Sequence, residues 1–452
     1  MLWRRRPLVA GAVTLFLSGL AIRAVSTVYR VALVRVAGED ILGLYQLTLP
    51  IYRLGWTLAT FGIPVAISQL SADRAGRGDM DGARRLRRAG LQLTALIAAA
   101  VSVGLALGSE GIAVHILTDP RTRLPLLVMP FLLVPAALCS AFRGVMQGEQ
   151  RMGPIAASNA LEVALRAPVV IYAVGWTAAY GVEWGAAGIV FGLTVGEVAS
   201  LALLVWLARS SLGIPDFARR PKARVRFGVS DFLPNARRLL RLAAPVMGSG
   251  VLNNVLNITS VAVIPRRLGL AGLAMEEAVR AYGRLSGMAI PILYMPMVVI
   301  WPIVSVLEPT VAKRRAQRGT QAIGPLVRKS YLIAAVISVL SSAAFLLLPE
   351  QLGHWLYGVE GLADLIRPLA VAAPFAYIGY ITSGILYGLG RTGIAMINSA
   401  AGNLVRLVLI WQLAADPAWG IVGVMWGVVA DYAVSSLCNL ISLPWAVRRS
   451  AL

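Results

Sequence analysis

The stretch Gly144-Val-Met-Gln-Gly148-Glu-Gln-Arg151-Met-Gly153 has a counterpart in the second half of the chain, Gly384-Ile-Leu-Tyr-Gly388-Leu-Gly-Arg391-Thr-Gly393. Glycine or arginine coincides at four positions of this ungapped block, and the same register continues to Arg166 and Arg406. Agreement of this kind within one block is not expected by chance. We therefore predict that the chain consists of two related halves.

A second pair of segments extends the repeat, because Trp184-Gly185-Ala-Ala-Gly188-Ile-Val-Phe-Gly192 lies against Trp419-Gly420-Ile-Val-Gly423-Val-Met-Trp-Gly427. These segments are apolar, as is most of the chain. Of the 452 residues, 58% are hydrophobic and only 14% are charged, and the mean hydropathy is +0.73. A soluble domain is typically about 45–50% apolar and about 25% charged. The composition therefore favours an integral membrane protein.

The apolar residues are grouped in blocks of roughly 20 residues, which is the length that spans a bilayer as a helix. Loops between the blocks carry the charges, glycines and prolines. We predict about twelve transmembrane helices, at 8–33, 41–70, 89–108, 124–146, 154–177, 185–208, 241–264, 284–307, 326–348, 366–389, 393–414 and 419–446.

Each half of the chain then has six predicted spans, so both halves enter the membrane from the same side. This arrangement is a parallel repeat, related by an axis along the membrane normal. We predict an all-α integral membrane fold with a six-helix bundle at 1–210, a basic cytoplasmic linker at 211–240 and a second six-helix bundle at 241–452. Two such bundles around a central cavity have the geometry of alternating access, so the repeat favours a transporter.

The distribution of lysine and arginine predicts the orientation. With a cytoplasmic N-terminus, about 29 basic residues fall in cytoplasmic loops and about 9 in loops on the other side. We therefore expect both termini in the cytoplasm. The run Arg4 to Arg6 before an apolar block resembles a signal peptide, but no cleavage site follows, and we expect a retained first helix.

The net charge of +21 would suggest nucleic-acid binding in a soluble protein. Here the topology explains it, and we expect no nucleic-acid partner. The longest polar stretch, Arg209 to Arg241, is predicted to be a linker that also meets anionic lipid headgroups.

Arginines inside apolar blocks are the main candidates for function. An arginine at mid-helix costs about 2.5–3.5 kcal/mol on insertion, so such residues are usually functional. Arg23 and Arg30 lie two turns apart on one helix face, Arg53 lies in the second block and Arg284 begins the eighth. If these side chains face one cavity, it is cationic and suits a phosphate-bearing ligand, since guanidinium binds phosphate oxygens in pairs. The alternative is that Arg30 and Arg284 extend to the interface.

Carboxylates inside the spans have two open interpretations. Glu162 and Arg166 are four residues apart and can neutralise each other on one helix face, whereas Arg406 lacks such a partner because Gly402 replaces the acid. Glu197 and Asp431 occupy similar places in the two halves. A buried carboxylate could bind a coupling proton or Na⁺, or it could pair with an arginine of the other bundle.

Prolines predict kinks in equivalent helices of the two halves. The second block carries Pro50 and Pro64, and the eighth carries Pro291, Pro296 and Pro302. By contrast, no protease, P-loop, hydrolase or zinc pattern occurs. The two histidines are too few for a metal cluster. We expect no enzyme, no metal and no cofactor.

Several motifs, taken in order, resemble a known family. They are Leu44-Tyr-Gln-Leu-Thr-Leu-Pro-Ile-Tyr-Arg53, Phe61-Gly-Ile-Pro-Val-Ala-Ile-Ser68, Arg143-Gly-Val-Met-Gln-Gly148, Tyr282-Gly-Arg-Leu-Ser-Gly-Met-Ala-Ile-Pro291 and Leu307-Glu-Pro-Thr-Val-Ala312. Together they resemble stage V sporulation protein B-type proteins, of the multidrug/oligosaccharidyl-lipid/polysaccharide exporter group. That group includes MurJ-type lipid II flippases and Wzx-type oligosaccharide flippases. The resemblance covers most of the chain and implies a MATE-like or MurJ-like fold.

The resemblance also implies a function. Such proteins move an undecaprenyl-pyrophosphate-linked sugar from the inner to the outer leaflet of the bacterial inner membrane. Arg23, Arg30, Arg53 and Arg284 look like the arginines that line the cavity of MurJ-type members. In MurJ-type members an acid follows the arginine of the eighth helix, whereas this chain has Gly287 at that place. The resemblance implies as partners a polyprenyl-pyrophosphate-linked glycan, membrane lipids and cell-wall synthesis enzymes.

MurJ-type and sporulation-type proteins usually have fourteen helices. We expect the last pair to be absent here, which leaves room for a lipid-linked glycan other than lipid II. The residues also leave open membrane potential, proton and Na⁺ as the energy source.

Three other functions fit the residues less well than a flippase does. A drug or cation antiporter of the multidrug and toxin extrusion type should carry acids in its first helix, where none is found. A membrane glycosyltransferase would need a catalytic acid and base on outer loops, and the predicted loops are short. A membrane scaffold would need neither the repeat nor intramembrane arginines. The sequence therefore favours the lipid-linked oligosaccharide flippase.

Overall fold

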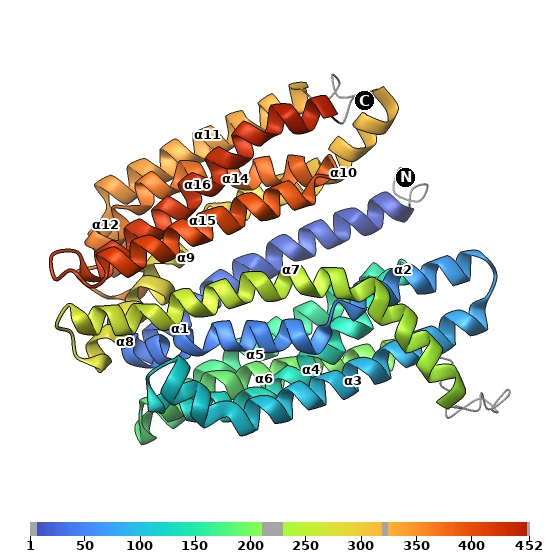
Figure 1. Ribbon diagram of the computed structural model, residues 1–452, viewed down its shortest axis with the longest axis horizontal. Helices are drawn as coiled ribbons and strands as arrows, with labels where there is room; N and C mark the ends of the chain where they lie inside the picture. Colours follow the sequence, from blue (N-terminus) through green and yellow to red (C-terminus); the bar gives the residue numbers. More distant parts are fainter. Residues whose placement is uncertain (1–6, 210–228, 319–323, 450–452) are drawn as a thin grey trace. The chain divides into compact units, whose positions relative to one another are not determined.

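The computed structural model describes residues 7–209, 229–318 and 324–449 (Figure 1). Within these ranges the chain is helical and has no strand. The principal helices of the first half are α1 (Pro7–Thr60), α2 (Ile63–Gly76), α3 (Met80–Gly111), α4 (Arg123–Gly148), α5 (Met152–Thr177) and α6 (Val182–Ala208). Those of the second half are α7 (Val229–Leu270), α8 (Met275–Gly283), the π-helical η5 (Arg284–Ala289), α9 (Ile290–Tyr294), α10 (Met297–Arg318), α11 (Gly324–Leu347), α12 (Pro349–Tyr357), α13 (Ala363–Ile366), α14 (Leu369–Gly388), α15 (Thr392–Leu413) and α16 (Gly420–Arg449).

Eight helical segments among the described residues are long and apolar enough to cross a membrane, or up to nine if one bent pair counts as a single span. The bent pair, Met275–Tyr294 and Met297–Ala312, turns by 59°. Pro296 stands at this break, as the prolines of the eighth block predict. The other predicted spans, 8–33, 41–70 and 241–264, fall on α1 with α2 and on α7.

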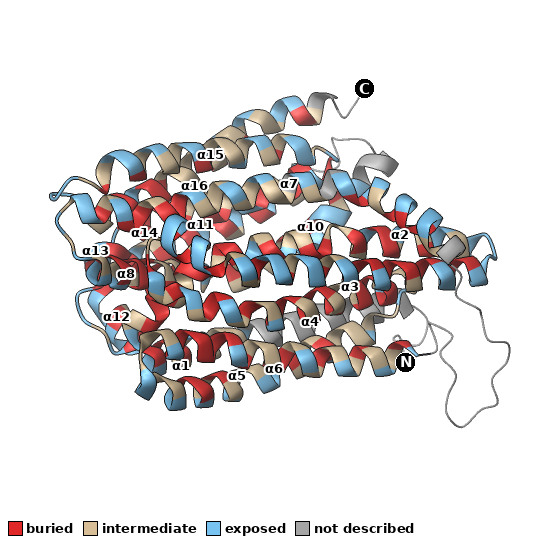
Figure 2. Ribbon diagram, turned by 60° about the horizontal axis from the view of Figure 1, so that its bottom comes forward, coloured by how far each residue is buried: buried red, intermediate tan, exposed pale blue. Residues whose placement is uncertain are grey.

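Exposed residues run along the helices (Figure 2). Among the exposed residues of the spans are large apolar ones, such as Leu107, Phe131, Tyr172 and Ile441. In a water-soluble bundle such positions would be polar. Here these side chains suit contact with lipid tails, so the exposed apolar surface is itself evidence for a membrane protein.

The described chain forms two compact units. Unit 1 comprises Met1–Tyr29 and Leu47–Val255, and unit 2 comprises Arg30–Gln46 and Leu256–Leu452. These limits differ in two places from the predicted bundles at 1–210 and 241–452. The first half of α7 belongs to unit 1, and a short part of α1 belongs to unit 2. Most of the predicted linker, 210–228, lies outside the described residues.

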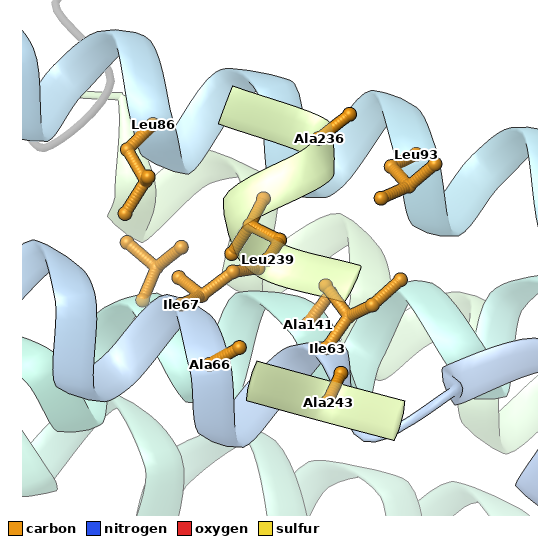
Figure 3. Close-up of a cluster of buried hydrophobic side chains, with 10 residues drawn as sticks. Ile63, Ala66, Ile67, Leu86, Leu93, Ala141, Ala236, Leu239 and Ala243 are labelled. Atoms are coloured by element: carbon orange, nitrogen blue, oxygen red, sulfur yellow. The ribbon is translucent and has the colours of Figure 1, made fainter. Parts of the chain in front are cut away.

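Packing explains why the start of α7 belongs to unit 1. Leu239 and Ala243 of α7 lie in one buried apolar cluster with Ile63 and Ile67 of α2 and Leu86 of α3 (Figure 3). Burying an aliphatic side chain of this size contributes about 1.5–3 kcal/mol. The sequence 229–243 therefore acts as a packed helix of unit 1 and not as a linker.

A break in α1 explains the other difference. Gly38 has φ 71° and ψ 179°, which a residue with a side chain would rarely adopt, so the helix changes direction there. The adjoining segment packs closely on α8. A Cβ built on Gly43 would meet the carbonyl oxygen of Val279, and one on Gly283 would lie 2.6 Å from the carbonyl oxygen of Glu39. Two glycines thus allow the backbones to touch.

The helix neighbours follow the repeat. In unit 1, α4 packs against α2, α3 and α6, and α5 packs against α6; in unit 2, α14 packs against α10, α11 and α16, and α15 packs against α16 (Figure 1). The repeat glycines mark equivalent contacts. Gly144 faces Pro64 and Gly384 faces Val304, and positions 64 and 304 are themselves counterparts in the register of the repeat.

The two equivalent glycines differ in what they face, which gives a matched prediction. A Cβ on Gly144 would meet the backbone of Pro64, whereas one on Gly384 would meet the side chain of Val304. We expect Gly144→Ala to lower the midpoint of thermal unfolding by about 5–10 °C and Gly384→Ala by less than half of that, because backbone yields less than a side chain. Gly153→Ala, with open space around it, is the control. Equal losses in Gly144→Ala and Gly384→Ala would contradict the packing.

Candidate functional site

Arg53 lies on α1 in unit 1, one turn after Pro50. Its side chain is exposed, and within the described ranges it makes no hydrogen bond or ion pair. The residue one turn further, Thr57, accepts a hydrogen bond of 2.9 Å from Asn254 of α7. Arg53 is therefore a cationic side chain with free donors beside a polar contact in an apolar region.

The other arginines of α1 are placed as follows. Arg30 belongs to unit 2 and is exposed, and it makes no hydrogen bond or ion pair with any described residue. Arg23 lies on the same helix, but its side chain is outside the described residues. Arg30 and Arg53 thus have free guanidinium groups, each within its own unit.

Arg284 is different, because its guanidinium is already bound. Its Nη2 donates to the carbonyl oxygen of Glu360 at 2.5 Å, and its Nε lies 3.5 Å from a carboxylate oxygen of Glu39. Gly287, where the resemblance leads one to expect an acid, packs against Leu42. The carboxylate close to Arg284 therefore comes from α1. Arg284 therefore differs from Arg30 and Arg53, because a carboxylate already lies close to its guanidinium group.

A charged cluster of unit 1 links α4, α5 and α6. Glu162 of α5 accepts hydrogen bonds from Arg166 at 3.0 Å and from Arg143 of α4 at 2.9 Å. Arg143 also donates to the hydroxyl of Ser200 on α6 at 3.1 Å. Glu162 is 9% exposed. Three helices thus meet around one buried carboxylate that serves two arginines.

Glu197 of α6 lies beside this cluster, near Glu162 and Arg143. Its Oε2 is buried and has no hydrogen-bond partner in the part of the chain that the structure describes. The backbone oxygen of Glu197 accepts a weak hydrogen bond of 3.4 Å from the thiol of Cys139. Unit 1 therefore holds a second, partly buried carboxyl group, whose Oε2 has no hydrogen-bond partner among the described residues.

The corresponding cluster of unit 2 is simpler. Arg406 of α15 lies 3.2 Å from a carboxylate oxygen of Asp431 on α16, and it donates to the amide oxygen of Asn257 at 2.9 Å. The sequence showed that Arg406 lacks an acid four residues before it. It could not show Asp431 as the partner, because that residue comes from another helix.

Arg143 is the functional candidate that the sequence analysis missed. It lies inside α4, and its side chain binds Glu162. Its position within the predicted span 124–146 was the available signal. No group of three metal-binding side chains occurs among the described residues.

Comparisons with known proteins show which family and which solved structures this chain resembles. Residues 8–315 match the family model described as polysaccharide biosynthesis protein. Stage V sporulation protein B of Bacillus subtilis (strain 168) is 28% identical over 442 residues, which cover 96% of this chain and 83% of that protein. The lipid II flippase MurJ of the same organism is 29% identical over 174 residues, 35% of this chain and 31% of that protein. An inward-facing multidrug resistance MATE family transporter of the MOP superfamily matches with a TM-score of 0.71 at 16% identity, covering 94% of each chain.

The fold defines the class of protein as a multi-pass, all-α membrane protein with the fold of solved MATE family transporters, and eight or nine candidate spans lie among the described residues. Within this class, the chain belongs to the polysaccharide biosynthesis protein family. The predicted fold class and the resemblance to stage V sporulation protein B and MurJ-type proteins are thereby confirmed.

Proposed function

We propose that this transporter flips a polyprenyl-pyrophosphate-linked oligosaccharide, lipid II or a related cell-wall or polysaccharide precursor, from the inner to the outer leaflet by alternating access. The observation that carries the proposal is the pair of exposed arginines on α1, Arg53 and Arg30, whose guanidinium groups have no partner among the described residues. A pyrophosphate cannot enter hydrocarbon with its charges unpaired. Guanidinium groups at membrane depth would replace the water that it loses.

Arg53, Arg30 and Arg23 are the proposed phosphate-binding residues, and Arg284 could bind phosphate only after releasing Glu39. The charged clusters around Arg166 and Arg406 lie on other helices of the two units. The family and the relative named as a lipid II flippase support a lipid-linked glycan as substrate. The relatives named for sporulation suggest a role in spore formation.

The bias of basic residues supports a bacterial inner-membrane protein with both termini in the cytoplasm. In that orientation, the ends of α2 and α3 that carry Arg74, Arg77, Arg84 and Arg85 face the cytoplasmic headgroups. The glycan-carrying lipid would be made on this side, and enzymes of cell-wall synthesis would supply it.

The test is a reconstituted flipping assay. Purified protein is placed in vesicles with a fluorescent polyprenyl-pyrophosphate sugar, and a membrane-impermeant quencher reports the fraction of labelled lipid in the outer leaflet. We expect protein-dependent flipping of the pyrophosphate lipid and much slower flipping of a phosphatidylcholine of similar label. Transport of a cationic dye against a proton or Na⁺ gradient, without flipping of any pyrophosphate lipid, would reject the proposal in favour of a multidrug antiporter.

A further inference from the structure

The two final helices of each repeat cross at a glycine. In unit 1, Gly196 of α6 lies against α5. A Cβ built on Gly196 would be 3.0 Å from the Cβ of Arg166 and 3.0 Å from the carbonyl oxygen of Glu162. At this crossing, α6 therefore contributes a glycine, and α5 contributes the acid that binds Arg166 at 3.0 Å.

The crossing in unit 2 has the opposite composition. Gly402 of α15 lies against α16, and a Cβ built on it would be 2.7 Å from the carbonyl oxygen of Asp431 and 2.5 Å from its Oδ1. Here α15 contributes the glycine, and α16 contributes the acid that binds Arg406 at 3.2 Å.

The register of the repeat makes these positions counterparts. Alignment of the first repeated block brings Glu162 opposite Gly402 and Arg166 opposite Arg406. Alignment of the second block, from Trp184 and Trp419, brings Gly196 opposite Asp431. The glycines Gly192 and Gly427 confirm this register in space, because Gly192 faces Val170 and Gly427 faces Ile410, which are again counterparts.

We propose that the acid of this crossing stands on the first helix of the pair in unit 1, α5, and on the second in unit 2, α16. Glu162 and Asp431 are then positioning residues with the same role, which is to hold the arginine at the crossing. The helices are too close for two side chains at the contact, so one helix must have glycine. An unpaired arginine in a span is costly, so the other helix supplies a carboxylate. Since either helix can supply it, the carboxylate acts through Arg166 or Arg406 and does not itself carry a transported cation or a coupling proton.

The rest of each cluster supports this reading. Two other positions of the clusters differ, because Ser383 stands where unit 1 has Arg143 and Tyr432 stands where it has Glu197. The arginine, one acid, one glycine and one serine, Ser200 in unit 1 and Ser435 in unit 2, are present in both. The link to transport rests on the proposed function, whereas the exchange itself rests on packing alone.

The experiment moves the acid of unit 1 to the place it has in unit 2. The exchange variant is Glu162→Gly with Gly196→Asp, and its matched control is Glu162→Gly with Gly196→Asn, which has the same size but no charge. In detergent, Glu162→Gly should lower the unfolding midpoint by about 8 °C. The exchange variant should recover about half of the loss, because the new carboxylate on α6 is expected to reach Arg166 but Arg143 would keep only Ser200. The Asn control should recover none.

Two further results decide the assignment. Adding Arg166→Gln to both double variants should abolish the difference between aspartate and asparagine at position 196, because the acid acts through Arg166. Equal midpoints of the two double variants, or a difference that persists without Arg166, would overturn the proposal.

The unfolding readout needs no substrate, so it stands even if the vesicle assay rejects lipid flipping. Where flipping is measured, the exchange variant should flip at least about fivefold faster than the Asn control, since a held arginine favours the folded bundle. An exchange variant that regains stability but not flipping would overturn the claim that Glu162 has only this positioning task.

Discussion

Replacement of Arg53 by glutamine is expected to slow flipping of a polyprenyl-pyrophosphate sugar about 100-fold and to leave the unfolding midpoint within about 2 °C. The side chain is exposed and has no partner among the described residues, so its loss breaks no contact of the fold. A hydrogen bond to a charged group contributes about 1.5–3 kcal/mol, and about 1.4 kcal/mol corresponds to a factor of ten. A two-pronged contact with phosphate oxygens therefore accounts for the expected loss.

Two control variants separate charge from geometry. Arg53→Lys keeps the charge but loses the paired donors, so we expect an intermediate rate. Arg85→Gln removes an exposed arginine near the start of α3 and should flip at the rate of the unchanged protein. Initial rates in vesicles, corrected for the amount of inserted protein, provide the measurement. Flipping by Arg53→Gln at the full rate would mean that Arg53 does not bind the lipid headgroup.

The helices could be predicted from the sequence because the bilayer imposes both length and apolarity on each span. The repeat could also be predicted, and its glycines had a physical meaning that the sequence did not reveal. Gly144 and Gly148 recur as Gly384 and Gly388 because each pair lets a neighbouring helix approach. A pattern of small residues at fixed spacing therefore carries information on packing as well as on ancestry.

The charged partners could not be predicted, since sequence spacing reveals only pairs on one helix. Glu162 and Arg166 are such a pair. Asp431 reaches Arg406 from a different helix, and Arg143 reaches Glu162 across 19 positions of the chain. Pairs of this kind depend on which helices pack together.

The limits of the two units could not be predicted from the sequence for a related reason. Hydropathy predicts two spans separated by a short loop, and the structure has two helices separated by a kink at a single residue, Gly38. The start of α7 looked like a linker because it carries Arg237, Arg238 and Arg241. Its other face buries Ala236 and Leu239 against unit 1, and this periodic pattern identifies a packed amphipathic helix.

Replacement of Gly283 by valine is expected to remove most of the folded protein from the membrane. A Cβ at this position would lie 2.6 Å from the carbonyl oxygen of Glu39 and 2.7 Å from the Cα of Gly43. Both contacts are with backbone, so α8 would have to move away from the segment Arg30–Gln46. Overpacking typically costs about 1–3 kcal/mol even where side chains can yield. We expect a fall in the unfolding midpoint of at least about 10 °C, or no extractable protein.

The same displacement would separate the charged groups that follow the contact. Arg284 comes directly after Gly283 and lies 3.5 Å from Glu39, and Arg280 binds Asp40 at 2.8 Å. Fluorescence-detected size exclusion of tagged protein from membranes measures the folded fraction. Gly393→Val, on α15 with open space around it, is the matched control and should retain the folded peak. A normal peak for Gly283→Val would mean that α8 does not touch α1 in the membrane. The pairing of Arg284 with Glu39, which depends on that contact, would then also be contradicted.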